Sequence, residues 1–246
     1  MPRREPATDH RLSGWARLVA ASAALLTVAV VTVVVWGLVT TEKRVATYSV
    51  RGSLDAIELD VGDADVEVLG AGGGATVQVR RTDSYAFGQS AQTTRGVRSG
   101  VLRIRSRCRA AVLGSCGASY RLRIPDNVPL AIRTAAGSVR LDGYRGSATV
   151  NTASGTVEVA GWCGFQLKVR ASQGDVSAAT SCAPERLELR SRSGDVRAQV
   201  PAGRYRVDAD SNAGSRRVSG LTVADDATFQ IQALSSSGNV DVEAIR

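Results

Sequence analysis

The sequence predicts an all-β fold: a β-solenoid (β-helix) of coils of about 19 residues, preceded by one N-terminal transmembrane α-helix. Three observations support this prediction. A glycine-centred motif recurs through the second half of the chain, apolar and polar residues alternate after each of these glycines, and one long uncharged segment lies near the N-terminus. With 43% apolar residues, 25 Gly and only 6 Pro, the composition excludes a disordered or collagen-like chain.

The N-terminal segment is typical of a membrane anchor. Residues 18–39 carry no charge, and the segment is long enough to cross a membrane as one helix. Trp15 and Trp36 stand near its two ends. We expect residues 1–17 to form a short cytoplasmic tail, residues 18–40 an uncleaved signal anchor in a cytoplasmic-type lipid bilayer, residues 41–52 a linker, and residues 53–246 an extracytoplasmic domain. Cleavage of the segment as a signal peptide is the alternative.

The first part of the expected domain contains a strand rich in acidic residues. From residue 54 to 68, apolar residues such as Ile57 and Leu59 alternate with acids such as Glu58 and Asp60, which predicts the start or the cap of the solenoid. Residues 82–99 are rich in Ser, Gly, Gln and Thr, and we expect them to form a loop. Nothing in this part indicates a second domain.

Two further alternating segments carry the candidate binding residues. Arginines alternate with other residues from position 103 to 109 and again at positions 121 and 123, so each set projects from one side of its strand. Guanidinium groups bind phosphate and carboxylate groups well, so we expect one basic surface for an anionic partner. Its residues are Arg103, Arg105, Arg107, Arg109, Arg121 and Arg123. The alternative is a solvated strand face balanced by acids of residues 58–67.

The repeated glycines are the strongest signal for the fold. Apolar residues stand two and four positions after each glycine, which is strand alternation, and a second alternating segment follows in most units. A unit with two short strands cannot bury its apolar face alone, so we expect the units to stack one on the next in chain order. A β-sandwich of meandering strands is the alternative. The repeat glycines are Gly137, Gly155, Gly174, Gly194 and Gly238, with Gly214 in a degenerate copy.

All four cysteines lie beyond the apolar segment, which is typical of an oxidising compartment. Cys163 and Cys182 each stand eight residues after a repeat glycine, so stacked coils place them side by side and predict a disulfide. Cys108 and Cys116 are expected to close a loop between two strands, with free thiols as the alternative.

The residue after each repeat glycine raises the question of catalysis. Asp175 and Asp195 share this position, and a pair of carboxylates on a β-helix could act as acid and base. Ser, Thr or Asn takes the same position in other units, which favours a role in forming the turn. His10 is the only histidine, which argues against a Ser–His or Cys–His pair and against a multi-histidine metal site. We therefore expect no catalytic residue, no metal and no cofactor.

The chain resembles the bacterial putative-adhesin family, a membrane-anchored β-helix domain of unknown function. The resemblance rests on residues 121–130, which end in a Pro-containing turn, and on the serial Ser/Thr-Gly-x-Val units, such as residues 152–157 and 191–196. It covers about residues 53–246. It implies a β-helix outside the cytoplasmic membrane, with adhesion as the family's label. The pair Arg216 and Arg217 departs from the pattern, because apolar residues are expected there.

Charge limits the expected partners. The net charge is +8, and nearly all of the 31 basic residues are arginines, which favours an anionic envelope polymer or lipid, or a protein, as partner. We expect no nucleic acid, because no aromatic residues alternate with the arginines and the domain lies outside the cell. The sequence thus predicts a putative adhesin that acts by surface binding, not an enzyme. The alternatives are an accessory or sensory protein of a cell-envelope response and a carbohydrate-active β-helix enzyme.

Overall fold

The computed structural model describes residues 14–39, 42–85, 91–108 and 116–245, in two compact units that divide between Thr41 and Glu42. The first unit contains helix α1 (Gly14–Val39), whose described side chains are all exposed. Its segment Leu18–Trp36 is long and apolar enough to cross a membrane, a property that anchors and signal sequences share. Most of the predicted cytoplasmic tail, residues 1–13, lies outside the described residues, as does residue 40 of the predicted span.

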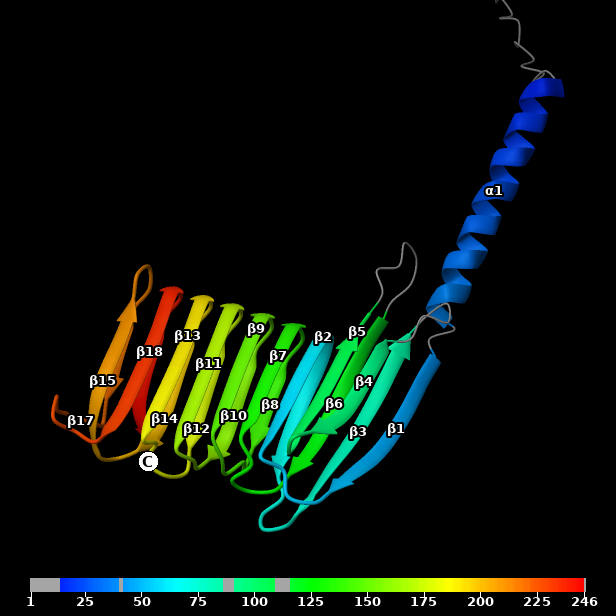
Figure 1. Ribbon diagram of the computed structural model, residues 1–246. Helices are drawn as coiled ribbons and strands as arrows, with labels where there is room; N and C mark the ends of the chain where they lie inside the picture. The colour runs from blue at the N-terminus through cyan, green and yellow to red at the C-terminus, as the bar shows by residue number, and fades with distance from the viewer. Residues whose placement is uncertain (1–13, 40–41, 86–90, 109–115, 246) are drawn as a thin grey trace, which may run out of the picture. The chain divides into compact units, whose positions relative to one another are not determined.

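The second unit is all-β and has the form of a solenoid with two facing sheets (Figure 1). The chain passes repeatedly from one sheet to the other, and strand β2 contributes to both. Pairing is parallel along most of the stack, while β1–β3, β3–β6 and β4–β5 pair antiparallel at one end. Sheet A contains, in spatial order, β1 (Glu42–Arg51), β3 (Thr76–Tyr85), β6 (Cys116–Ile124), β2 (Ala56–Gly70), β8 (Val139–Asp142), β10 (Val157–Trp162), β12 (Val176–Thr180), β14 (Val196–Pro201), β19 (Val240–Ile245) and β16 (Arg216–Ser219). Sheet B contains, in spatial order, β4 (Gln92–Arg98), β5 (Val101–Arg107), β2, β7 (Leu130–Ala136), β9 (Ala148–Ser154), β11 (Gln166–Gln173), β13 (Arg186–Ser193), β18 (Phe229–Ser237), β15 (Arg204–Ser211) and β17 (Thr222–Val223).

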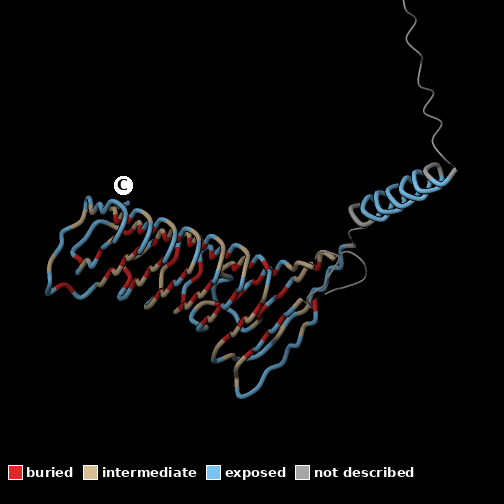
Figure 2. Tube along the Cα trace, turned by 90° about the horizontal axis from the view of Figure 1, so that it is seen from above, coloured by how far each residue is buried: buried red, intermediate tan, exposed pale blue. Residues whose placement is uncertain are grey.

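The core lies between the two sheets and consists of columns of aliphatic residues. Along most strands, buried residues alternate with partly or fully exposed ones (Figure 2). Sheet A contributes a Val, Leu or Ala pair from each repeat, such as Val157 and Val159, and sheet B contributes pairs such as Leu187 and Leu189. The narrow core explains why so few aromatic residues suffice, although Trp162 and Tyr144 are fully buried in it.

The repeat glycines form the turns that lead from sheet B to sheet A. Gly155 has a φ of +124°, and a Cβ built on it would lie 2.2 Å from the carbonyl oxygen of Gly137 in the neighbouring coil. Gly174 has a φ of +117° and stands in the same relation to Gly155, at 2.3 Å. Both the left-handed backbone and the close approach of the next coil therefore require glycine. Buried hydroxyls reinforce these turns, as where Ser191 Oγ donates to the Gly174 carbonyl at 2.9 Å.

The coils do not stack in chain order at the two ends, and that part of the prediction is wrong. The last coil, β18 and β19, lies between the coil of β13 and β14 and the coil of β15 and β16. Likewise β2 lies between the β5–β6 coil and the β7–β8 coil, as Figure 1 shows. The charged pair Arg216 and Arg217 explains the C-terminal arrangement: both side chains are exposed in β16, which has a strand on one side only. The apolar β19 instead has strands on both sides.

Two segments predicted to be irregular contain strands. Within the expected linker, residues 41–52, Glu42–Arg51 form β1, which pairs with β3, and its Tyr48 and Val50 pack against the core. Residues 82–99, expected as a loop, include the end of β3 and all of β4. Ladder hydrogen bonds to β5 hold β4 in place, although its own side chains are mostly polar. Residues 86–90 of this segment lie outside the described residues.

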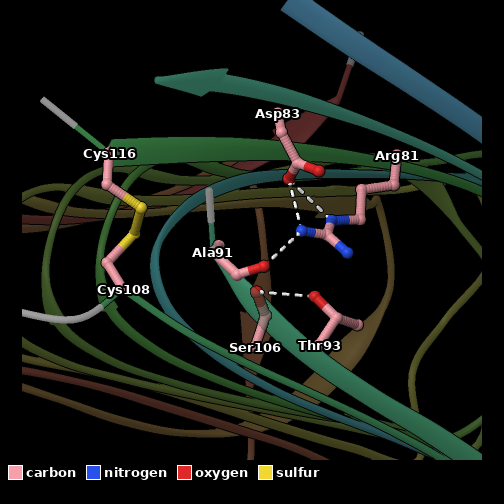
Figure 3. Close-up of a disulfide and its surroundings, with 7 residues drawn as sticks. All are labelled: Arg81, Asp83, Ala91, Thr93, Ser106, Cys108 and Cys116. Carbon is pink, nitrogen blue, oxygen red and sulfur yellow. Dashed lines mark hydrogen bonds and ion pairs between the residues drawn. A yellow bond between two sulfur atoms is a disulfide. The ribbon is translucent and has the colours of Figure 1, made fainter. Parts of the chain in front are cut away.

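The structure contains both expected disulfides. Cys163 and Cys182 follow β10 and β12, neighbouring strands of sheet A, and their Cα atoms are 5.2 Å apart. Cys108 and Cys116 are bonded where the chain crosses from β5 to β6, with Cα atoms 6.0 Å apart. Figure 3 shows this second bond beside a partly buried ion pair, in which Arg81 Nη2 lies 2.6 Å from Asp83 Oδ1. The same guanidinium donates to the Ala91 carbonyl at 2.9 Å, so this end of the stack is cross-linked both covalently and by polar contacts.

Candidate anion-binding surfaces

The predicted arginines do not share one surface. Arg103, Arg105 and Arg107 lie on β5 and point outward from sheet B, whereas Arg121 and Arg123 lie on β6 and point outward from sheet A. The prediction of a single basic surface is therefore wrong. Alternation fixes which side of a strand a residue occupies, but the chain changes sheets between β5 and β6. Arg109 lies outside the described residues.

Three of these arginines form ion pairs with the acidic strand β2. Arg103 Nε lies 2.8 Å from Glu58 Oε2, Arg107 Nη2 lies 3.0 Å from Asp60 Oδ1, and Arg121 Nε lies 2.6 Å from Glu67 Oε2. All three are surface pairs, with arginine side chains 49–65% exposed, so each contributes at most about 1 kcal/mol to stability. For these three arginines the structure therefore supports the alternative given above, a solvated strand face whose charge is balanced by the acids of residues 58–67.

Arg105 and Arg123 are exposed and have no ion pair among the described residues. Arg105 lines a shallow hollow of about 330 Å³ on the outer face of sheet B, together with Arg103, Arg98 and Gly96. Arg123 stands on the opposite face of the solenoid. The predicted set therefore leaves two guanidinium groups free to bind an anionic partner, one on each outer face.

The aspartates that raised the question of catalysis form hydrogen bonds between coils. Asp175 Oδ1 accepts a hydrogen bond from the backbone N–H of Asp195 at 2.8 Å, and Asp195 Oδ1 accepts one from the N–H of Asn239 at 2.7 Å. Asp65 does the same for Ser138 at 2.8 Å. Each side chain thus satisfies the backbone of the neighbouring coil, not its own turn, and this ladder explains why Asp and Asn recur at the position.

The repeat also places arginines that sequence reasoning missed. Arg133, Arg170 and Arg190 stand four residues before repeat glycines, on neighbouring or next-neighbouring strands of sheet B. Asn151 takes the same position in the intervening coil. The sequence already shows that these arginines stand at the same distance from a repeat glycine. Counting from the glycines, as was done for Cys163 and Cys182, would have found them.

The fold and these faces define a class of protein: a two-sheeted parallel β-solenoid with exposed arginines on its outer faces, in a chain that also has an apolar N-terminal helix. Residues 127–243 match the Toastrack DUF4097 family. This match confirms, over residues 127–243, the family resemblance seen in the sequence.

Among the solved structures similar to the chain are ones whose names refer to adhesion or lipid binding. A putative cell adhesion protein from Clostridium sporogenes has a TM-score of 0.45 at 9% identity, covering 83% of this chain and 100% of its own. A putative adhesin from Bacteroides fragilis has a TM-score of 0.34 at 12% identity, with 83% and 98% covered. A putative lipid binding protein from Parabacteroides distasonis has a TM-score of 0.25 at 9% identity, with 82% and 97% covered. Likeness at this level carries no conclusion about a ligand. No curated protein matches the chain.

Proposed function

We propose that this chain is a membrane-anchored adhesin-like module that binds an anionic component of the cell envelope by surface contact, without catalysis. Residues 18–40 anchor it in the cytoplasmic-type bilayer, residues 1–17 form a cytoplasmic tail, and the β-solenoid lies outside the membrane. Because β1 belongs to the solenoid, the domain begins at residue 42. The repeating unit is a coil of about 19 residues, which the pairing of Val157 with both Val139 and Val176 supports.

The observation that carries the binding proposal is the presence of unpaired arginines on both outer faces. Arg105 and Arg123 are exposed and lack carboxylate partners among the described residues, so binding an anion would not first require breaking an ion pair. Arg103 and Arg107 flank Arg105, and Arg121 flanks Arg123, but these three are paired with acids of β2, so the unbalanced charge is that of Arg105 and Arg123. The absence of catalysis is supported by Asp175 and Asp195, whose carboxylates are occupied by the backbone of the neighbouring coil.

Protease treatment of spheroplasts tests the orientation. The two disulfides support an oxidising location for the domain, so added protease should digest the chain beyond about residue 41. Complete protection of the domain, with digestion only after the membrane is permeabilised, would place it in the cytoplasm and contradict the proposed topology.

Binding is tested with the full chain in nanodiscs of zwitterionic lipid and two anionic probes, phosphatidylglycerol vesicles and long-chain inorganic polyphosphate. We expect binding to at least one probe that weakens steeply from about 0.05 to 0.2 M salt, because exposed charges are screened within about 8 Å at physiological ionic strength. The double variant Arg105→Gln/Arg123→Gln should weaken it severalfold and change stability by no more than about 1 kcal/mol. Failure of the wild type to bind either probe at low salt would refute the function. Unchanged binding by the variant would contradict the role of these two arginines in binding and would leave the proposed function in place.

A further inference from the structure

A second basic hollow lies further along the outer face of sheet B, away from the predicted arginines. It has a volume of about 430 Å³ and is lined by residues of β9, β11, β13 and β18. Three arginines line it, with an amide and several hydroxyl groups, and none of the described lining residues is acidic. The polar residues that matter here are Asn151, Arg170, Ser172, Arg190, Arg192 and Ser236.

The register of the sheet brings the arginines together. Arg170 pairs with Arg190 on the adjacent strand and with Asn151 on the other side, at a strand spacing of about 4.8 Å. Like charges directly opposite each other destabilise a sheet. Glu188, on the same strand as Arg190, forms an ion pair with Lys168, whose Nζ lies 3.0 Å from Glu188 Oε2. The two arginines therefore occupy paired positions on adjacent strands, and neither has an ion pair among the described residues.

Arg190 is held in position and is still incompletely satisfied. One of its terminal nitrogens donates to the Gln232 side-chain oxygen. Its Nε is buried and has no hydrogen-bond partner among the described residues, which is costly for a charged group unless a further acceptor is present. Arg170 and Arg192 are exposed at the hollow. An oxyanion in the hollow would accept hydrogen bonds from the exposed guanidinium groups of Arg170 and Arg192 and offset the repulsion between the arginines.

We propose that this hollow binds phosphate groups of an extended anionic polymer that lies along the stack of coils. A polymer is favoured over an isolated anion because the same row continues past Asn151 to Arg133, two strands or about 10 Å from Arg170. Successive phosphates of one polymer can thus contact successive coils. This inference rests on the proposed function, since it assigns the anionic component a chemical class and a place on the domain.

The test uses the full chain in zwitterionic nanodiscs and long-chain inorganic polyphosphate. The variant Arg170→Gln/Arg192→Gln removes two exposed charges from the hollow, and Arg145→Gln/Arg217→Gln removes two exposed charges elsewhere as a matched control. We expect the hollow variant to bind about tenfold more weakly or worse, and the control to change binding no more than about twofold. The charge-preserving variant Arg170→Lys/Arg192→Lys should fall between them, because lysine cannot make the bidentate contact.

The outcomes separate this inference from the proposed function. Equal weakening by the hollow variant and the control would show that only net charge matters, and unchanged binding by the hollow variant would show that the site lies elsewhere; either overturns the inference. Wild-type binding to phosphatidylglycerol vesicles without binding to polyphosphate would also overturn it while leaving the proposed function in place. Orthophosphate at the same phosphate concentration should compete only weakly, and equal competition would contradict an extended ligand. An unchanged circular dichroism spectrum confirms that each variant is folded.

Discussion

Replacing Gly174 by alanine should destabilise the domain strongly, and the structure gives the size of the effect. Gly174 has a φ of +117°, which costs a residue with a Cβ about 1–3 kcal/mol. Its new methyl would lie 2.3 Å from the carbonyl oxygen and 2.8 Å from the carbonyl carbon of Gly155, and both atoms belong to the backbone, which cannot rotate away. Forcing a methylene into such a contact costs about 1–3 kcal/mol more.

The expected net loss is about 2–5 kcal/mol, because alanine also restricts the unfolded chain and recovers a fraction of a kcal/mol. That is a large share of the roughly 5–15 kcal/mol by which a domain is stable. Gly73→Ala is the matched control, since a Cβ there meets no atom within 4 Å and its φ is not left-handed. We expect the control to stay within about 0.5 kcal/mol of the wild type.

Urea unfolding of the full chain in detergent, followed by far-ultraviolet circular dichroism, measures both variants. With a slope of about 2–3 kcal/mol per molar urea, Gly174→Ala should lower the midpoint by about 1–2 M. Equal midpoints for Gly174→Ala and Gly73→Ala would show that the coils can separate to admit a side chain. The glycine turns would then not set the spacing of the stack, and the argument from close approach would fail.

Two further substitutions test the covalent and ionic contacts. Replacing Cys163 and Cys182 by serine should cost about 3 kcal/mol on the chain-entropy model for a loop of 19 residues, and peptide mapping of the wild type without reduction should recover a linked pair; free alkylation of both thiols would contradict the stacked register. Burial opposes the ionisation of Glu188, but the hydrogen bond and charge of Lys168, together with the charges of Arg190 and Arg170, outweigh it, and the pKa of this carboxyl lies below its usual value. Because the folded-state pKa is lowered, the stabilisation is present above the unfolded pKa and is lost as pH falls through the folded pKa. Glu188→Gln should therefore be about 1 kcal/mol less stable than the wild type near neutral pH, with a difference that shrinks below about pH 4, whereas a pH-independent difference would exclude this pair as its source.

Most strands could be predicted because their signals are local. Alternation after Gly155 and Gly174 is a property of a few consecutive residues, and it predicts the strands that β10 and β12 form. Cys163 and Cys182 each stand eight residues after a repeat glycine, and this shared position predicted one long-range contact, their disulfide. β1 was not predicted because it has few apolar residues. It is held by pairing with β3, and no local sequence pattern indicates that contact.

The order of the coils could not be read from the motif. Coils with nearly the same apolar pattern can stack on one another in any order. The motif therefore determines the position of each residue within its coil, but not which two coils lie next to each other. The one available signal was the charged pair Arg216 and Arg217, which the sequence marks as a departure and the structure places in β16 at the end of the stack. The same limit applies to the arginines. Alternation places Arg105 and Arg123 outside, but only the path between β5 and β6 determines that they lie on opposite faces.

The glycine turns connect stability to the candidate binding site. Arg170 and Arg190 each stand four residues before a repeat glycine, so the spacing that Gly174 and Gly194 permit between coils also sets the spacing between the backbone positions of the two arginines. These strands carry parallel partners on both sides, within a stack whose last coil, β18 and β19, is itself held between two others. The arginines are thus positioned by the backbone ladder and not by a flexible loop, and little conformational entropy remains to be lost when a ligand binds. An alanine at Gly174 that moved the coils apart would therefore weaken polyphosphate binding as well as stability, even though no residue of the hollow had changed.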